Sequence, residues 1–434
     1  MSGVDVVGLC RLRGTLIGQI ALKIVRLNMK FGIARLKNPV QEYAWGSKTV
    51  IAKLLGEPAP SARPQAELWI GAHPKAPSQV FQGDRWIPLP HWIEDSPEEI
   101  LGTGVAKRFS NKLPFLFKVL AAGMPLSIQA HPDLEQARKG FVFENEKEIP
   151  LQASHRNYRD DNHKPELICA LTSFWCLNGF RKIEDIIGLV GKTGNVDLTA
   201  LSGCLYETPT NRALQIFFSR LMTMDKKLQS QLVEKVMDSV KRLDEQETVF
   251  QWMTHLHQSY PSDIGVLSPL FLNLVQLQPG EALYIPARTL HSYISGAGIE
   301  LMANSDNVLR GGLTSKHIDV TELLKSLRFV EQPTELLAPR VLSTSETLYP
   351  TDTVEFMLSV IRLNPNTRFM SALERSVEIF ICTEGHVAII DTDDGGVVEL
   401  RMGDSAIVPA ALRQYSLEGQ ATLFKASVPL ELMR

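Results

Sequence analysis

The apolar residues of this chain form short or alternating runs from about residue 34 to residue 180, and Pro, Gly, Asn and Asp separate the runs. Runs of this kind are typical of β-strands bounded by turns. One short helix is predicted in SPEEILGTGVAKRF (96–109), with Ser96 as its cap and Pro97 at its first position. The predicted strands lie in AELWIGAHP (66–74), SQVFQ (78–82), PLSIQAH (125–131) and PELICAL (165–171).

The pattern changes between residues 181 and 260, where apolar residues recur every three or four positions. Such spacing places them on one face of a helix, so we predict a helical insert here. His255 and His257 fall inside it, and we interpret them as surface or packing residues. The spacing is clearest at Leu228, Leu232, Val233, Val236, Met237, Val240 and Leu243.

After Pro261 the strand pattern returns, and it contains an internal repeat. PGEALYIPARTLHSYISG (279–296) aligns without gaps with MGDSAIVPAALRQYSLEG (402–419). A glycine, a strand, Pro-Ala and a second strand recur in both copies, as in a jelly-roll hairpin. His291 in the first copy falls opposite Gln414 in the second. The repeat indicates two β-barrels of one design, of which only the first retains its histidine.

Together these patterns predict a mainly β fold with two jelly-roll β-barrels and an inserted helical domain. Residues 31–180 and 261–320 would form the first barrel, and residues 181–260 the insert. Residues 321–434 would form a second barrel without a metal site.

Residues 1–30 are basic and apolar, with Asp5 as their single acid. They fit a targeting segment, an amphipathic surface helix, or translation assigned to an upstream start codon. We favour the third interpretation, in which Met29 begins the protein and the extension before it is spurious or disordered.

Composition and charge narrow the classes of partner. The 434 residues are 44% apolar and 21% charged, and 45 basic residues nearly balance 48 acidic ones. No broad field would attract nucleic acid, so local charges would have to hold any anionic ligand. The five cysteines lack the spacing of metal or redox sites, and no apolar stretch reaches membrane-spanning length. We expect a cytoplasmic monomer without nucleic-acid or membrane partners.

The stretch SIQAHPD (127–133) places polar residues inside a predicted strand. Side chains two apart in a strand point the same way, so Ser127, Gln129 and His131 would share one face. Pro132 would then end the strand pairing. Buried polar groups need partners, which here could be side chains, water or a metal ion.

Two further segments offer ligands. Glu166 opens a strand after a polar turn, and His291 lies on the strand that follows YIPARTL (284–290). Two imidazoles, a carboxylate and an amide oxygen make an N/O set suited to Zn²⁺ or a similar divalent ion. Downstream, residues 300–319 contain two glycines and a group of charged or titratable residues, Glu300, Asp306, Arg310, Lys316 and His317. This segment could bind an anion, or it could be a solvated turn.

At this point the chain resembles a known family, the type I phosphomannose isomerases of the zinc cupin superfamily. The resemblance runs from about Leu36 to the C-terminus. It is carried by LKNPVQEYAWGSK (36–48), AELWIGAHPK (66–75), LPFLFKVL (113–120), PLSIQAHPD (125–133), NHKPEL (162–167) and SDNVLRGGLT (305–314).

The resemblance implies cupin-type barrels and one zinc ion per chain, held by Gln129, His131, Glu166 and His291. It also implies interconversion of D-mannose 6-phosphate and D-fructose 6-phosphate through a cis-enediol, with an essential arginine at Arg310. The chain departs from the family pattern at LHSY (290–293), at GGLTSK (311–316) and in its first thirty residues. These departures remove no ligand and bear only on loop conformation and on Lys316.

Other roles follow from the motifs. Lys164 or His163 is expected to act as the proton-transfer base, with Glu300 as the next candidate. Lys164 could instead bind phosphate, His163 could hydrogen-bond the loop, and Glu300 could orient a metal ligand. Expected substrate contacts are Ser127, Lys118, Lys316, Trp45 and Asp306.

Two rival classes differ in testable ways. A cupin oxygenase would use iron with three histidines or a His-His-carboxylate triad, and would need no phosphate cradle. A non-catalytic sugar-binding or storage barrel would have no use for a polar face centred on a metal.

Overall fold

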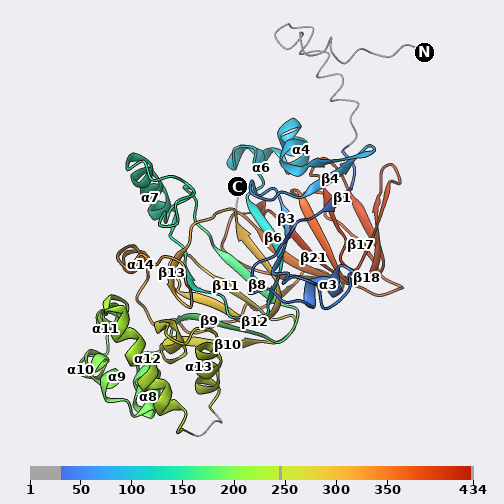
Figure 1. Ribbon diagram of the computed structural model, residues 1–434. Coiled ribbons are helices and arrows are strands. Elements are labelled where there is room, and N and C mark those ends of the chain that lie inside the picture. The colour runs from blue at the N-terminus through green and yellow to red at the C-terminus, as the bar shows by residue number, and fades with distance from the viewer. Residues whose placement is uncertain (1–30, 244–246, 432–434) are drawn as a thin grey trace.

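The computed structural model describes residues 31–243 and 247–431. The expectations for residues 1–30 lie outside this part of the chain. Figure 1 shows two β-sheet regions, one mostly orange and red, and a group of green helices at the far end of the other. The predicted class, a mainly β chain with a helical insert, is confirmed.

The first sheet has ten strands, whose main path runs β10-β9-β12-β6-β3-β2. Its long strand β12 pairs antiparallel with four others, β6, β7, β8 and β9, and so ties the sheet together. The strands are β2 (Val40–Gln41), β3 (Glu67–Gly71), β6 (Phe115–Ala122), β7 (Ile128–Ala130), β8 (Glu166–Ala170), β9 (Phe174–Phe180), β10 (Leu272–Leu277), β11 (Ala282–Ile285), β12 (His291–Ala303) and β13 (Leu309–Gly312).

The second sheet has eleven strands, ordered β14-β15-β16-β21-β18-β20-β1-β4-β5 along its main path. Strand β21 pairs with β16, β17 and β18 and so links these three strands. The strands are β1 (Ala34–Lys37), β4 (Gln79–Gln82), β5 (Arg85–Pro88), β14 (Arg340–Val341), β15 (Glu346–Tyr349), β16 (Met357–Leu363), β17 (Arg368–Met370), β18 (Glu378–Asp391), β19 (Val397–Arg401), β20 (Ser405–Val408) and β21 (Tyr415–Ser427).

Sheet membership does not follow the boundaries drawn from the sequence. Strands β1, β4 and β5, which that division places in the first barrel, belong to the sheet of the C-terminal segment. Strand β1 pairs with β20 through Ala34 and Ile407, and so covers what would otherwise be an exposed sheet edge. Placing all of residues 31–180 in the first barrel is therefore wrong for these three strands.

Helices fill the expected insert. They are α8 (Ile183–Thr193), α9 (Val196–Leu201), α10 (Gly203–Glu207), α11 (Asn211–Thr223), α12 (Lys226–Val240) and α13 (Thr248–Ser259), followed by the 3-10 helix η1 (Ile264–Leu270). Outside the insert lie α3 (Val50–Leu54), α4 (Leu89–Asp95), α5 (Pro97–Leu101), α6 (Thr103–Arg108), α7 (Leu134–Glu146) and α14 (Val320–Ser326). Among the described residues, no helix is both long and apolar enough to cross a membrane.

The single helix predicted in residues 96–109 is wrong in one respect. The chain forms two helices there, α5 and α6, separated at Gly102. Gly102 has a φ of +93°, a backbone conformation that ends α5 and favours glycine. Ser96 is at the N-cap position, but its side chain makes no capping hydrogen bond.

Strand β7 is held from one side by the apolar core that the first sheet shares with the helical insert. Ile128 and Ala130 are buried in this core together with Leu267 and Leu290. Alternation along the strand then turns Gln129 to the opposite face. The core thus fixes which side of β7 is polar.

Candidate metal centre

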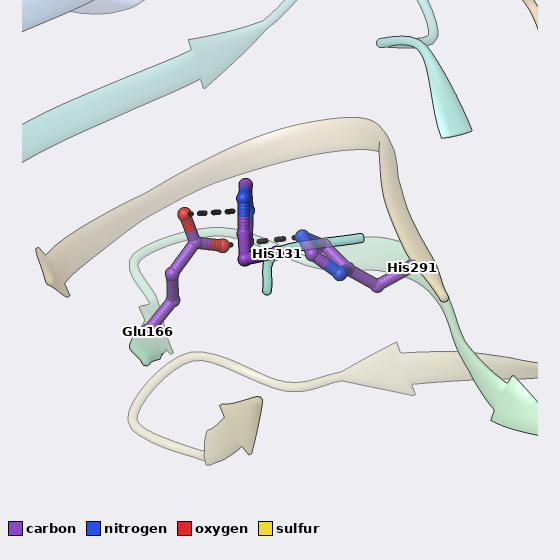
Figure 2. Close-up of side chains that lie close together, drawn as sticks. All are labelled: His131, Glu166 and His291. Atoms are coloured by element: carbon purple, nitrogen blue, oxygen red, sulfur yellow. Dashed lines mark ion pairs between the residues drawn. The ribbon is translucent and has the colours of Figure 1, made fainter. Parts of the chain in front are cut away.

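Two imidazoles and a carboxylate meet inside the first sheet (Figure 2). Nε2 of His131 lies 3.3 Å from Oε1 of Glu166, and Nε2 of His291 lies 3.2 Å from Oε2 of the same carboxylate. The three residues are at most 2% exposed. The sequence placed all three in one candidate site, and the structure brings them together. Their role as metal ligands is taken up as a proposal below.

Strand ends position the three side chains. Glu166 is the first residue of β8 and His291 the first of β12, while His131 follows β7 directly. Beyond Pro132, Asp133 caps α7 by accepting a hydrogen bond from the backbone N–H of Gln136. The chain on both sides of His131 is therefore anchored, by a strand before it and a capped helix after it.

Backbone carbonyls orient both imidazoles. Nδ1 of His131 lies 2.6 Å from the carbonyl of Asn307, and Nδ1 of His291 lies 3.0 Å from that of Thr289. A carbonyl can only accept, so each Nδ1 carries the hydrogen and each Nε2 keeps a free lone pair. Within the described residues, both Nε2 atoms and Oε2 of Glu166 are buried without a hydrogen-bond partner. Buried polar atoms are rarely left this way.

The donor set and its spacing fit a zinc ion. Imidazole nitrogen and carboxylate oxygen are ordinary zinc ligands, and two of them bound at about 2.0 Å in a tetrahedral arrangement lie about 3.3 Å apart. The observed separations of 3.2 and 3.3 Å agree with this spacing. An ion at this point would also satisfy the lone pairs that have no partner.

Gln129 and Arg310 lie in the same row of the sheet as His291. Gln129 on β7 is paired with His291 on β12 and, on its other side, with Arg310 on β13. Paired residues of adjacent strands project from the same face. The register therefore directs all three side chains to the side of the sheet where the centre lies.

Electrostatics favour the protonation states that a metal ligand needs. Burial lowers the pKa of His131 to about 4, and the positive charge of Lys164 acts in the same direction. Burial opposes ionisation of Glu166, but the positive charge of Lys164 leads the effects that outweigh it, and the pKa of this carboxyl lies well below its usual range. Nζ of Lys164 lies 3.0 Å from Oε1 of Glu166. A neutral imidazole and a charged carboxylate are the binding forms.

A second buried charge network adjoins the centre. Nζ of Lys118 lies 2.7 Å from Oε2 of Glu300 and 3.3 Å from Oε1 of Glu67, whose other oxygen accepts from the indole N–H of Trp69. Burial opposes the charge on Lys118, but Glu300 and Glu67 outweigh it and raise its pKa. Lys118 and Glu300 are both predicted site residues, and they form a buried ion pair with each other. Glu67 was not predicted, although it is the single charged residue of β3.

Asp306 and His163 each have a partner outside the ligand set. The carboxylate of Asp306 lies 2.9 Å from Nζ of Lys75 and 3.7 Å from Nε2 of His73. His163 reaches across to the C-terminal segment, where its Nε2 lies 2.8 Å from Oε1 of Glu355. The structure thus places Asp306 in an ion pair and fixes the orientation of the His163 ring.

Three cations, Arg310, Lys316 and Arg159, lie close enough for their charges to act on one another. Burial lowers the pKa of Arg310, and the nearby charge of Arg159 lowers it further. Burial also lowers the pKa of Lys316, with Arg310 and Arg159 adding to the effect. Charges that disfavour one another in this way favour a bound anion. Arg159 was not predicted, because its position relative to Arg310 depends on the folded loop.

The remaining predicted contacts are Ser127 and Trp45. Ser127 is half-buried immediately before β7. Trp45 packs against the apolar cluster that contains Leu126 and Tyr293. Both side chains thus belong to elements that frame the first sheet, and neither is part of the His-Glu group.

Asn307 is a further residue that the sequence did not single out. It is fully buried, and its side chain bonds the carbonyls of Asp160 and Asn162 and the N–H of Arg159, at 2.7–2.9 Å. Its own carbonyl accepts from His131. One asparagine thus links the 159–162 loop to a candidate metal ligand. Only its burial and bonding reveal this role, since asparagine is common in exposed loops.

Comparison with known proteins gives consistent matches. The family model described as "Phosphomannose isomerase type I, catalytic domain" matches residues 33–183, and that described as "Phosphomannose isomerase type I, helical insertion domain" matches residues 193–272. The mannose-6-phosphate isomerase of Escherichia coli (strain K12) is 39% identical over 395 residues, covering 90% of this chain and 98% of that protein. The mouse mannose-6-phosphate isomerase is 34% identical and covers 91% and 95%.

Solved structures agree with these matches. A zinc-bound mannose 6-phosphate isomerase superposes with a TM-score of 0.85 at 37% identity, covering 92% of this chain and 99% of that one. The Salmonella typhimurium enzyme bound to its substrate fructose 6-phosphate and to zinc gives the same TM-score, identity and coverage. The resemblance inferred from the sequence motifs is confirmed.

Proposed function

The chain belongs to the type I phosphomannose isomerase family, and on this premise we propose that it is a zinc-dependent isomerase that interconverts D-mannose 6-phosphate and D-fructose 6-phosphate. The observation that carries the proposal is the buried group of His131, Glu166 and His291, with lone pairs that have no partner within the described residues. The substrate and zinc bound in the Salmonella typhimurium structure support it.

The reaction moves a proton between C2 and C1 of the sugar, and we propose a cis-enediol intermediate. A bound zinc ion, held by His131, Glu166, His291 and Gln129, would supply Lewis-acid polarisation of a sugar oxygen. We propose that Arg310 stabilises the negative charge that develops on the enediolate oxygens. Its guanidinium is planar and presents several N–H donors in a fixed geometry. Arg310 lies in the same row of paired residues as Gln129 and His291.

Three groups are candidates for the proton transfer. Lys164 and His163 come first, and Glu300 follows because its carboxylate is engaged by Lys118 at 2.7 Å. The carboxylate of Glu355 supports His163, since it would stabilise an imidazolium formed when the ring accepts a proton. Replacement of His163 by asparagine should lower kcat about a hundredfold or more if this ring transfers the proton. An unchanged kcat would remove it from that role.

The substrate phosphate requires an anchor away from the reacting carbons. We propose Lys316 and Arg159 for this role, with Arg310 between them and the metal centre. The support is their mutual electrostatic effect, which a dianionic phosphate would relieve. Lys75 and Asp306 already neutralise each other and need no phosphate.

Replacing Lys316 with alanine should raise KM for the sugar phosphate about tenfold and change kcat by less than about threefold, because the phosphate contact is made equally in the ground and transition states. Steady-state kinetics in both directions check this result. The matched control is Lys325→Ala, since Lys325 is exposed and pairs with Glu322 on α14. Equal kinetics for the Lys316 and Lys325 variants would exclude Lys316 as an anchor.

The function itself is tested by a coupled assay for fructose 6-phosphate formed from mannose 6-phosphate. Activity should disappear on chelation and return with zinc. Absence of turnover in the zinc-loaded chain would overturn the proposal. Bound iron together with oxygen uptake would indicate a cupin oxygenase instead.

We also propose that the enzyme is a cytoplasmic monomer with no nucleic-acid or membrane partner. The near-balance of 45 basic and 48 acidic residues supports the absence of a nucleic-acid partner. Sedimentation of the full chain at twice the protomer mass would contradict the monomer.

A further inference from the structure

The end of the helical insert is bonded to β7 and β13, two strands of the proposed active site. The hydroxyl of Tyr260 donates a hydrogen bond to the carbonyl of Pro125, 2.9 Å away and shortly before β7. Further along, the carboxylate of Asp263 accepts two hydrogen bonds from the segment that follows β13. Because β7 and β13 are antiparallel, with Gly312 paired to Ile128, both contacts lie at the same end of the strand pair.

Asp263 binds two successive backbone amides of the segment 313–316, which we call the anchor loop. The N–H of Leu313 donates to Oδ1 at 2.9 Å, and the N–H of Thr314 donates to Oδ2 at 3.2 Å. The hydroxyl of Thr314 in turn accepts from the N–H of Lys316 at 3.1 Å. One carboxylate of the insert thus orders the loop that leads to Lys316.

The conformation of the anchor loop needs such support. Leu313 has a φ of +52°, in the left-handed region that is unfavourable for residues other than glycine. Residues in this region persist where their surroundings fix them. Leu313 is 1% exposed, and Asp263 accepts from its N–H. Burial and this hydrogen bond therefore hold the turn.

Two glycines bring the insert and the anchor loop into direct contact. A Cβ on Gly265 would lie 2.8 Å from the backbone nitrogen of Leu313, and a Cβ on Gly312 would lie 2.9 Å from Cα of Gly265. Such distances leave no room for a side chain at either position. The absent side chain of Gly312 thus makes room for the insert.

The insert is a rigid support at this point. All seven residues of η1, which directly follows Asp263, are buried. Ile264, Val266 and Leu267 belong to the core that the insert shares with the first sheet. Oδ1 of Asp263 also caps η1 by accepting from the N–H of Gly265 at 2.7 Å. Capping uses one oxygen only, so the two bonds to the anchor loop are additional contacts.

We propose that Asp263 is a positioning residue for substrate binding, which sets the anchor loop so that Lys316 meets the phosphate of the sugar. The inference rests on the proposed function, in which Lys316 anchors that phosphate. Arg310 precedes the loop and is held separately, because β13 pairs with β7 on both sides of it. Loss of the Asp263 carboxylate should therefore weaken substrate binding more than it slows the chemical step.

The test uses Asp263→Ala in the full-length, zinc-loaded chain. KM for mannose 6-phosphate should rise about tenfold, while kcat changes by less than about threefold and one zinc per chain is retained. Asp263→Asn keeps one of the two acceptor oxygens, so its KM should rise about threefold. The asparagine variant decides the result if the alanine variant does not fold.

The matched control is Asp225→Ala, in the same insert. Asp225 is exposed and caps α12 by accepting from the N–H of Lys227 at 2.9 Å. Its replacement should lower the melting temperature, as loss of a cap does, and leave KM and kcat unchanged. This control separates a general loss of stability in the insert from a displaced anchor loop.

Two kinetic results would each overturn the inference: a KM in the Asp263 variants equal to that of the control, or a lower kcat with an unchanged KM. Binding of inorganic phosphate, followed by phosphorus NMR, needs no turnover. Asp263→Ala should bind phosphate about tenfold more weakly than the unaltered chain. If the unaltered chain lacked isomerase activity and this loss were still observed, only the proposed function would fail. Equal phosphate affinity in the two chains would remove Asp263 from the role.

Discussion

Replacing His291 with alanine is expected to abolish zinc binding and isomerase turnover while leaving the chain folded. The imidazole has its Nδ1 held by the carbonyl of Thr289, so its Nε2 lone pair is committed to the centre. Without it, three of the four proposed ligands remain, His131, Glu166 and Gln129, and three ligands bind zinc less tightly than four. Turnover should fall more than about a hundredfold, because a bound ion supplies several kcal/mol of charge stabilisation in the transition state.

The fold should survive because His291 is only the first of the 13 residues of β12. The rest of that strand stays paired with β6 and β8. Loss of the Nδ1 hydrogen bond costs about 1 kcal/mol, a small part of the stability of a domain of this size. Metal content per chain, a coupled assay and a thermal melt measure the three expectations separately.

His255→Ala is the control for this experiment. His255 is exposed on α13, and its ring contacts Trp252 rather than the centre. Its variant should keep zinc and full activity. If His291→Ala retained one zinc per chain and normal turnover, the three-residue group could not be the metal centre.

The sequence predicted the polar face of the strand before His131 because alternation in a strand is a local rule. Burial of Ile128 and Ala130 in the shared core leaves Gln129 on the other face, and this follows from spacing alone. Long-range partners do not follow from spacing. Asn307 lies 176 residues from His131, and Glu355 lies 192 residues from His163. No periodicity connects such positions.

The same reason explains the error in the domain boundaries. Strand β1 alternates between buried and exposed residues, β4 and β5 are only partly buried, and none of these patterns specifies a partner strand. Only β1 pairs with β20, at the edge that the C-terminal segment leaves open more than 300 residues further along, and β4 and β5 join the sheet through β1. Likewise, the repeat showed that Gln414 stands opposite His291, but only the folded chain shows the surroundings of Glu378, which begins its strand as Glu166 does. There, Nζ of Lys425 lies 3.1 Å from Oε1 of Glu378.

Replacing Arg310 with alanine should leave zinc in place and reduce turnover by about 2–4 kcal/mol of transition-state stabilisation, or about 30- to 1,000-fold. The residue is not part of the His-Glu group, so the metal should stay. Arg310 lies in the row of Gln129 and His291, where we propose that charge develops on the sugar oxygens. An interaction made mainly in the transition state lowers kcat more than it raises KM.

Arg310→Lys separates charge from geometry. Lysine keeps the positive charge but lacks the planar pair of donors, so we expect the lysine variant to recover only part of the loss. Kinetics and metal content of both variants decide the result, and Arg288→Ala is the control, because Arg288 pairs with Asp133 at 3.3 Å and bonds the carbonyl of Ser326. An unchanged kcat in Arg310→Ala would remove this residue from the chemistry. Loss of zinc in that variant would instead show that Arg310 supports the metal centre.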